Sequence, residues 1–367
     1  MKKILFSGYY GFENSGDDAF LEVCAWGAKK YWGTTNNTFL TSNLPLLKNS
    51  AKSLTPYRIK GSTHAQVIAH SINADYFISA GGSTFSKHTE YSLRDVALKT
   101  RNILNKSMRV GAIGVSIGPF KSLSDEQNIV KYLKKMNFLS LRDKASYEYA
   151  KSLSLPYEPI EAFDLAALLP KVYSYKKNND RKTDNKKIIG VSVCNYERYV
   201  GGNLDAEKSR NEYLLKLIAN LPNEAGYIFR FFVFNGNSRV GDEEITNYFV
   251  SKLPKRNIQI IPYLNNVEAT WKAIAECDLV ISTRLHASIF ACYADVPFFL
   301  MEYHRKCTDF LNDVGQPKCY RLNNELNDIS KIVDEIEMIL KTGIYKKAEH
   351  IESTKALATN NFSKVII

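Results

Sequence analysis

The sequence contains no cysteine pair with the spacing of a zinc site. Its 6 cysteines include no Cys-x-x-Cys, and the shortest separation runs from Cys307 to Cys319. Structural zinc sites usually draw two ligands from such a pair, so we expect no metal site. We also expect a cytoplasmic protein, and disulfides are rare in the cytoplasm. Most of the cysteines should therefore be small hydrophobic residues of the core.

Long hydrophobic runs are missing too. No stretch of about 18 residues is uniformly apolar, so no transmembrane helix is predicted. The first residues, 1–8, become polar too early for a signal peptide and indicate a strand that begins at once. We therefore expect a cytoplasmic protein.

The chain has an excess of positive charge but no nucleic-acid motif. Lys and Arg number 49 against 38 Asp and Glu, and this net charge of +11 favours an anionic substrate or membrane surface. Part of the excess is local, because the segment 171–187 holds seven basic and two acidic residues. No basic run alternates with aromatic residues, so we expect no nucleic-acid partner. Peripheral contact with the inner membrane surface stays open, and nothing in the pattern indicates an oligomeric state.

Short apolar runs alternate with amphipathic stretches. Strands are predicted at Ile4–Ser7, Tyr76–Ser79, Val110–Val115, Phe138–Leu141, Ile188–Cys194, Tyr227–Phe234, Ile258–Ile261, Leu279–Ser282 and Pro297–Met301. Predicted helices include Asp17–Lys30, Asp143–Leu153, Ala206–Leu221, Val267–Cys277, His286–Ala294 and Ile329–Leu340. Such alternation predicts parallel sheets with helices on both faces.

A polar, unpatterned stretch divides the chain of 367 residues, which is long enough for two domains. This stretch, 171–187, is typical of a linker. We expect an α/β fold with two Rossmann-like domains, 1–170 and 188–345, that face a central cleft. A helical tail is expected at 346–367.

The glycine-rich loop after the first strand lacks both common nucleotide fingerprints. Its glycines, Gly8, Gly11 and Gly16, do not have the Gly-x-Gly-x-x-Gly spacing. The last two have P-loop spacing, but Asp17 and Asp18 stand where Lys and Ser or Thr are required. Two carboxylates at this position would repel a polyphosphate.

This loop is better suited to an uncharged, hydroxylated ligand such as a sugar, with Asn14 and Asp17 as hydrogen-bonding partners. The alternative is plain helix capping by Ser15 or Asp17. Two further glycine loops follow predicted strands, at 79–85 and 114–120. We expect all three loops to line the same edge of the N-terminal sheet.

A second group of candidates follows the strands of the other half. Arg284 and His286 come directly after the apolar run 279–281. Ligands bind at the carboxyl ends of strands in open α/β sheets, so this pair predicts an anion site with an acid or base beside it. Lys306 follows the next strand and is expected nearby. Arg142 also ends a strand and either binds an anion or pairs with a neighbouring carboxylate.

Together these pieces resemble the polysaccharide pyruvyltransferase family. The matching segments are Gly8-Tyr-Tyr-Gly-Phe-Glu-Asn-Ser-Gly-Asp-Asp, Ala80-Gly-Gly-Ser-Thr-Phe, Gly114-Val-Ser-Ile-Gly-Pro, Ser140-Leu-Arg-Asp-Lys-Ala-Ser, Phe163-Asp-Leu-Ala, Ser282-Thr-Arg-Leu-His-Ala-Ser, and Pro297 through Tyr303 to Lys306. Each segment alone is unspecific, whereas the ordered set is specific.

The resemblance implies a fold like that of the two-Rossmann-domain (GT-B) glycosyltransferases, with the donor on the C-terminal domain. It implies transfer of a pyruvyl group from phosphoenolpyruvate to two hydroxyls of a sugar, which forms a cyclic ketal and releases phosphate. The acceptor would be an exopolysaccharide, another cell-surface polysaccharide or a lipid-linked oligosaccharide precursor. Phosphoenolpyruvate is the donor substrate, and no cofactor is expected.

The resemblance also suggests roles for the candidates. Arg284 and Lys306 would clamp the donor, with Arg142 reaching across the cleft. His286 would deliver a proton to the donor and Asp17 would deprotonate the acceptor hydroxyl. The residues expected to bind the acceptor are Gly11, Asn14, Gly16, Asp17, Gly82, Ser83 and Gly118.

Two other functions stay open at this point. One is a GT-B-type glycosyltransferase with a nucleotide-sugar donor, and the other is a non-catalytic saccharide-binding relative. The presence of both Arg284 and His286 argues against the second.

Overall fold

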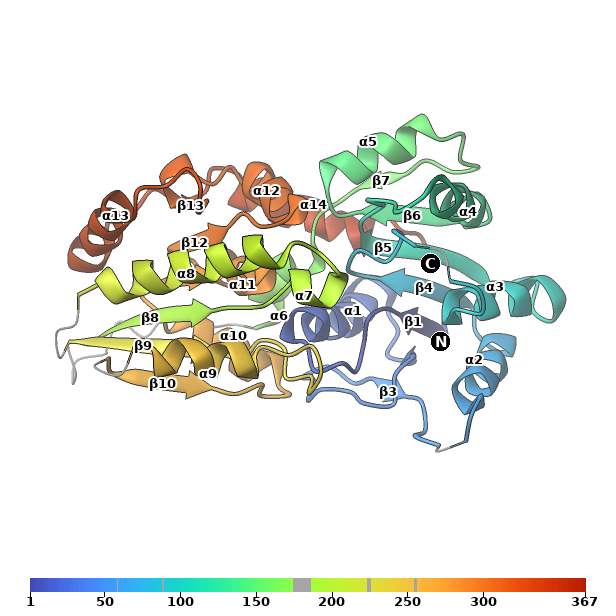
Figure 1. The fold of residues 1–367 in the computed structure, drawn as a ribbon. Helices are drawn as coiled ribbons and strands as arrows, with labels where there is room; N and C mark the ends of the chain where they lie inside the picture. Colours follow the sequence, from blue (N-terminus) through green and yellow to red (C-terminus); the bar gives the residue numbers. More distant parts are fainter. Residues whose placement is uncertain (58, 88, 174–185, 223–225, 254–255) are drawn as a thin grey trace. The chain divides into compact units, whose positions relative to one another are not determined.

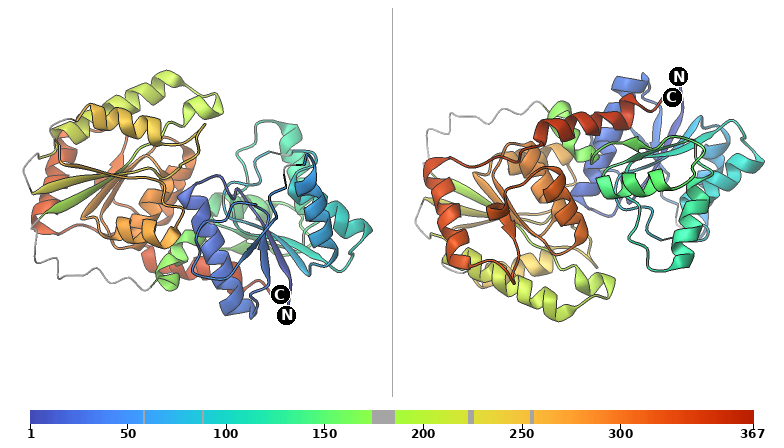
Figure 2. Two further views of the ribbon diagram at one scale, coloured as in Figure 1. Left: turned by 90° about the horizontal axis from the view of Figure 1, so that it is seen from below. Right: turned by 90° about the horizontal axis from the view of Figure 1, so that it is seen from above.

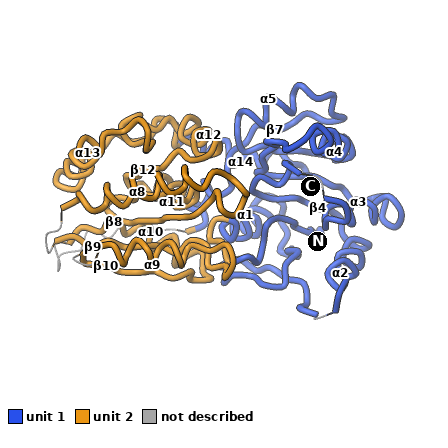
Figure 3. Tube along the Cα trace, viewed as in Figure 1, with its two compact units in different colours: residues 1–12, 17–172, 352–367 blue, residues 13–16, 173–351 orange. Residues whose placement is uncertain are grey.

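The computed structural model describes residues 1–57, 59–87, 89–173, 186–222, 226–253 and 256–367. The described chain forms two compact units (Figure 3). Unit 1 comprises residues 1–12, 17–172 and 352–367, and unit 2 comprises residues 13–16 and 173–351. Most of the expected linker lies outside the described residues, and the central cleft stays a prediction.

Unit 1 contains a seven-stranded parallel sheet in the order β3-β2-β1-β4-β5-β6-β7 (Figure 1). Its strands are β1 (Ile4–Ser7), β2 (Asn37–Phe39), β3 (Lys52–Ser53), β4 (Tyr76–Ala80), β5 (Arg109–Val115), β6 (Phe138–Leu141) and β7 (Ile160–Glu161). Its helices are α1 (Ser15–Trp32), α2 (Ser62–Ile72), α3 (Leu93–Ile103), α4 (Leu123–Leu133), α5 (Lys144–Ser152), the 3₁₀ turn η1 (Leu165–Leu168), α6 (Leu169–Val172) and α14 (Ile351–Ser363). Every residue of β5 after Arg109 is buried, because helices cover both faces of the sheet (Figure 2).

Unit 2 contains a six-stranded parallel sheet in the order β10-β9-β8-β11-β12-β13. Its strands are β8 (Lys187–Ser192), β9 (Tyr227–Phe232), β10 (Ile258–Ile261), β11 (Leu279–Ser282), β12 (Phe298–Met301) and β13 (Arg321–Leu322). Its helices are α7 (Glu197–Val200), α8 (Leu204–Asn220), α9 (Glu243–Ser251), α10 (Val267–Ala275), α11 (Leu285–Tyr293), α12 (Arg305–Asp313), the 3₁₀ turn η2 (Lys318–Tyr320) and α13 (Ile329–Thr342). The two expected parallel α/β domains are thus confirmed. Within the described residues, no helix has both the length and the apolar character that crossing a bilayer requires.

The expected C-terminal tail, 346–367, is divided between the two units, because its helix α14 packs against unit 1. The Phe362 ring stacks on the Tyr31 ring with centroids 5.8 Å apart, and Trp32 Nε1 donates to the Phe362 carbonyl at 3.1 Å. The Asn361 side chain accepts a hydrogen bond from Ser140 Oγ at 2.6 Å. Residues 352–367 therefore complete unit 1.

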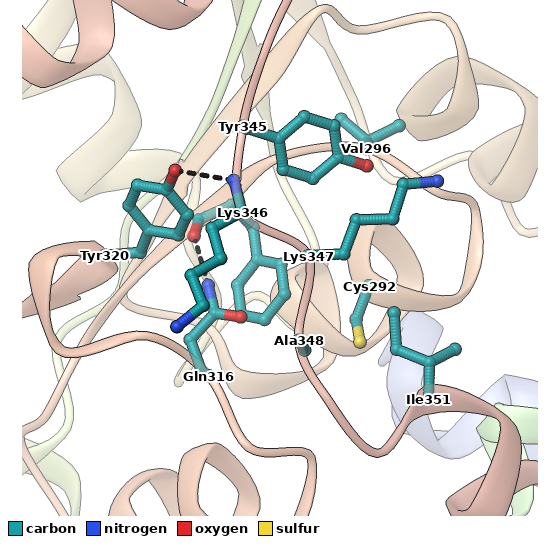
Figure 4. A pocket seen from close by; sticks show the side chains of 10 residues that line it. Cys292, Val296, Gln316, Tyr320, Tyr345, Lys346, Lys347, Ala348 and Ile351 are labelled. Atoms are coloured by element: carbon teal, nitrogen blue, oxygen red, sulfur yellow. Dashed lines mark hydrogen bonds between the residues drawn. The ribbon is translucent and has the colours of Figure 1, made fainter.

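The preceding segment, 345–351, instead lines a hollow on unit 2 together with residues 292–298, Gln316 and Tyr320 (Figure 4). There the backbone N–H of Lys346 donates to Tyr320 Oη at 2.9 Å, and Gln316 Nε2 donates to the Phe298 carbonyl at 2.9 Å. Lys347 pairs with Asp295 at 2.6 Å. The contacts of Lys346 and Lys347 attach the segment to η2 and to the loop before β12.

The short segment 13–16 of the first glycine loop belongs to unit 2. The backbone N–H of Ser15 donates to the Phe234 carbonyl at 2.9 Å, and that of Gly236 donates to the Glu13 carbonyl at 2.8 Å. Both partners lie in the loop after β9. The loop was expected to serve the N-terminal sheet alone, whereas the structure divides it between the units.

Candidate active site

Arg284 lies between the end of β11 at Ser282 and the start of α11 at Leu285. Its Nε donates to both oxygens of Asp242, at 3.0 and 2.9 Å, and its Nη2 donates to the same carboxylate. Asp242 is completely buried, and its Oδ2 also accepts the backbone N–H of Asn235 at 3.0 Å. This pairing holds the Nε and Nη2 edge of the guanidinium. Nη1 takes no part in the pairing, and the Arg284 side chain is 21% exposed.

This ion pair keeps Arg284 charged. Burial by itself lowers the pKa of Arg284, but the Asp242 carboxylate outweighs burial, and the pKa lies above its ordinary value. Asp242 occupies the N-cap position of α9, yet its side chain makes no capping hydrogen bond there. Sequence reasoning missed it because an aspartate before a helix is typical of a cap.

His286 lies in the first turn of α11, against the backbone of Gly16. A Cβ atom built on Gly16 would lie only 2.2 Å from Nδ1 of His286, so glycine alone leaves room for the imidazole. Asn14 supports this turn, because its Oδ1 accepts the backbone N–H of Gly16 at 3.1 Å. Asn14 and Gly16 were expected among the acceptor ligands, and they lie in unit 2 beside His286.

Lys306 lies in the first turn of α12, beside two tyrosines. Its Nζ is 5.2 Å from the centroid of the Tyr196 ring and 5.7 Å from that of Tyr303. His304 Nδ1 accepts the backbone N–H of Lys306 at 3.1 Å and so caps the helix. Burial lowers the pKa of His304, as do the charges of Lys306 and Arg305, which favours the neutral imidazole that this cap needs.

Cys194, just after β8, lies within electrostatic reach of a group of charged side chains in unit 2. Burial raises the pKa of its thiol to about 11, so it stays protonated at neutral pH. Four charged side chains lie close enough to act on this pKa, namely Arg284, Asp242, Lys306 and Arg210. Arg284 and Lys306, which were expected near each other, thus both act on the thiol of Cys194.

Arg210 is a cation of this group that the sequence did not reveal. It lies on α8 with only 3% of its surface exposed, and its Nη1 donates to Glu197 at 2.8 Å. Its guanidinium lies 5.1 Å from the centroid of the Tyr303 ring. An arginine within an amphipathic helix usually faces solvent, so the pattern gave no signal for this position. The group as a whole joins three cations with two carboxylates, which suits a small anionic ligand.

In unit 1, Arg142 connects three loops at the carboxyl edge of the sheet. Its Nε donates to Ser116 at 2.8 Å, Nη1 to Asp164 at 2.8 Å and Nη2 to Ser83 at 3.1 Å. The arginine is 8% exposed and Asp164 is 4% exposed. These contacts match the structural alternative, pairing with a neighbouring carboxylate, and they also engage the Ser83 hydroxyl. A role of Arg142 in binding the donor stays a prediction.

Asp17 lies beside the second glycine loop of unit 1. Its Oδ1 is 3.8 Å from the position that a Cβ on Gly82 would occupy. Gly82, Gly11 and Gly118 all have positive φ, at 76°, 79° and 71°. These values belong to the left-handed region, where glycine is favoured, so each loop can turn sharply at the edge of the sheet.

Two exposed aromatic rings lie in the first glycine loop. Tyr9 and Phe12 stack with centroids 4.2 Å apart, and they are 50% and 44% exposed. Burial raises the pKa of Tyr9, and the nearby Asp17 carboxylate raises it further. The sequence analysis did not single out either ring, although exposed aromatics beside a glycine loop are a usable signal for ligand binding.

The sequence matches the family model described as Polysaccharide pyruvyl transferase over residues 14–305. The chain belongs to the polysaccharide pyruvyl transferase family. The match begins at Asn14, includes Arg284 and His286, and ends just before Lys306. The resemblance seen in the sequence is thereby confirmed. Among curated protein sequences, none matches significantly.

Solved structures resemble this polysaccharide pyruvyl transferase family member over nearly its whole length. A putative UDP-N-acetylglucosamine 2-epimerase from Listeria monocytogenes has a TM-score of 0.60 at 11% identity, covering 99% of this chain and 93% of its own. The UDP-GlcNAc 2-epimerase from Methanocaldococcus jannaschii has a TM-score of 0.60 at 12% identity, covering 98% of each chain. An α,α-trehalose 6-phosphate synthase from Burkholderia multivorans has a TM-score of 0.52 at 10% identity, covering 99% and 93%. These neighbours have the GT-B fold, which confirms the expected fold class.

Proposed function

We propose that the protein transfers a pyruvyl group from phosphoenolpyruvate to two hydroxyls of a sugar and releases phosphate. The observation that carries the proposal is the group in unit 2: Arg284 held by buried Asp242, Lys306 in the same group of charges, and His286 in the first turn of the helix that Arg284 precedes. Membership of the polysaccharide pyruvyl transferase family supports a transferase with a sugar or polysaccharide acceptor.

The donor requires several cationic contacts, because it carries both a carboxylate and a phosphate. Arg284 offers its Nη1 group, which takes no part in the pairing with Asp242, and Lys306 offers an ammonium group. Such charge-assisted hydrogen bonds contribute roughly 1.5–3 kcal/mol each. The N-terminus of α11 adds a favourable dipole, and the side chain of its N-cap residue, Arg284, makes no capping hydrogen bond there.

The proposed reaction begins with proton transfer from His286 to the methylene carbon of phosphoenolpyruvate. This creates an oxocarbenium-like centre at the next carbon, and the first sugar hydroxyl attacks it and loses its proton. Phosphate then leaves, and the second hydroxyl closes the ketal ring as it loses its own proton. Histidine suits the first step because its ordinary pKa lies near neutrality.

The acceptor side of the proposal rests on unit 1. Asp17 lies close to both Gly82 and Tyr9, and it is our candidate to accept the proton of the attacking hydroxyl. The exposed Tyr9–Phe12 stack provides a flat apolar surface for one face of the sugar ring. A carboxylate beside an aromatic surface suits an uncharged polyol and disfavours a polyphosphate.

Tyr9→Ala is expected to raise the KM for the acceptor several-fold while leaving the KM for phosphoenolpyruvate unchanged, because a stacked contact contributes about 0.5–1.5 kcal/mol. Steady-state kinetics with each substrate varied in turn would check this. Tyr57→Ala is the matched control, since Tyr57 is another exposed tyrosine of unit 1, 58% exposed. An unchanged acceptor KM in Tyr9→Ala would remove the aromatic stack from the acceptor site.

Gly16→Ala is expected to lower kcat by roughly 10²-fold, because the added methyl group must push the His286 imidazole from its position. Rates of phosphate release at saturating substrate would measure the effect. Gly226→Ala is the control, because a Cβ there meets open space. If kcat is retained in Gly16→Ala, the reaction does not depend on the placement of His286.

Incubation of the purified protein with phosphoenolpyruvate and a panel of sugar glycosides tests the proposed function. We expect phosphate release that depends on the sugar, together with a product heavier by one pyruvyl ketal. A GT-B glycosyltransferase would instead be protected against thermal unfolding by a nucleoside diphosphate and not by phosphoenolpyruvate. A non-catalytic relative would bind the saccharide without releasing phosphate.

A further inference from the structure

Unit 1 has a strongly basic groove at the edge of its sheet opposite the glycine loops. The groove lies where β5 and β6 begin, whereas the glycine loops follow the carboxyl ends of the strands. Five of the residues that line it are basic, and none of the lining residues is acidic. The basic residues are Arg101, Lys106, Arg109, Lys134 and Lys135.

The fold brings these cations together from separate segments. Arg101 lies in the last turn of α3, and its Nη1 donates to the backbone carbonyl of Lys135, just after α4, at 2.8 Å. Cations at the ends of α3 and α4 complement the helix dipoles. Lys106 and Arg109 belong to no helix, so helix dipoles do not account for their positions.

Exposed aliphatic residues lie in the chain between residues that line the basic groove. Ile103 is 73% exposed and Leu104 is 58% exposed, and both lie between Arg101 and Lys106 in the chain. Asn105 Nδ2 donates to the Ser71 carbonyl at 2.9 Å, which ties this turn to the end of α2. There Ile72 is 43% exposed. The exposed aliphatic residues therefore lie in the turn between groove-lining Asn102 and Lys106 and at the helix end that this turn contacts.

We propose that this surface, the basic groove with Ile72, Ile103 and Leu104, docks on the anionic headgroups of a phospholipid bilayer. Cations attract an anionic membrane, and neighbouring aliphatic side chains enter its interface. A soluble polyanion would be bound by the cations but would gain nothing from the exposed aliphatic residues. The inference is independent of the proposed function, and docking at this edge leaves the glycine loops at the other edge accessible.

Sedimentation of the full-length protein with lipid vesicles tests the proposal. We expect binding to vesicles that contain phosphatidylglycerol, little binding to pure phosphatidylcholine, and weaker binding at high salt. The double variant Lys134→Glu/Lys135→Glu is expected to bind about 25-fold more weakly or worse, since each basic residue near the surface contributes roughly fivefold in affinity. Ile103→Ser/Leu104→Ser should also bind several-fold more weakly.

Lys208→Glu/Lys216→Glu is the matched control, because it makes the same change of charge on exposed positions of α8 in unit 2. The proposal requires this control to bind vesicles within about twofold of the unaltered protein. Equal loss in both charge variants would mean that only net charge matters and would overturn the proposal. So would unchanged binding after Ile103→Ser/Leu104→Ser, or binding to RNA or heparin but not to vesicles. Phosphate release with a soluble sugar should be unaltered in every variant, which separates this test from that of the proposed function.

Discussion

Replacing His286 with alanine is expected to lower the rate of phosphate release from phosphoenolpyruvate by about 10²–10⁴-fold, the usual contribution of a positioned acid. The donor should still bind, because Arg284 and its partner Asp242 remain in place. A phosphate-release assay, combined with protection of the protein by phosphoenolpyruvate against thermal unfolding, would measure the two effects separately.

His70→Ala is the matched control for this prediction. His70 is exposed in the last turn of α2 and lies outside the candidate site, so its loss should not alter the rate. Unaltered phosphate release in the His286 variant would assign proton transfer to another group. Loss of donor binding together with the rate would instead give His286 a binding role.

Removing Asp242 should damage both the stability and the donor affinity of unit 2. In Asp242→Ala, Arg284 keeps its charge in a mostly buried position without its carboxylate partner. Breaking a buried ion pair costs about 3–5 kcal/mol, and the low end applies because the Arg284 side chain is 21% exposed. Urea unfolding would measure this loss.

Asp242→Asn is the milder variant, because it preserves the shape of the side chain and removes the charge. We expect a tenfold or larger increase in the KM for phosphoenolpyruvate, roughly as for Arg284→Lys, which cannot bind an anion through two nitrogens. Asp205→Asn, at an exposed position in the first turn of α8, is the control. A reduced stability with an unaltered donor KM would leave Asp242 a purely structural partner of Arg284.

Most of the fold could be predicted from the apolar runs. Strands β1, β6 and β11 begin and end at the predicted residues, because a buried parallel strand leaves a nearly continuous apolar run with sharp polar ends. The edge strand β10 also has the predicted bounds, although its residues are partly exposed. Strands β2, β3, β7 and β13 were missed. They are two or three residues long, and so short a segment has no detectable period.

The candidate site could be predicted only where a side chain directly follows a strand. Arg284 and Lys306 were found by that rule, and the structure brings both close to Cys194. Asp242 and Arg210 were missed, because their roles depend on partners that are distant in sequence. Arg284 lies 42 positions from Asp242, and no local pattern encodes that pairing.

The loop segment 13–16 illustrates a different limit. Its glycines and Asn14 were read as part of the first βα connection, which is where a sugar-binding loop of the N-terminal sheet would lie. Hydrogen bonds from Ser15 and to Glu13 attach the segment to the loop after β9 instead. Sequence order alone cannot show that one loop serves two units.

The division of the tail between the units has a consequence for the order of synthesis. Phe362 packs against Gly27 and Tyr31, so α1 lacks part of its cover until helix α14 is made. Ribosomes add about 5–20 residues per second, so the synthesis of residues 173–351 takes roughly ten seconds or more. During that time unit 1 stays incompletely covered, because the helix that completes it is encoded after residue 351.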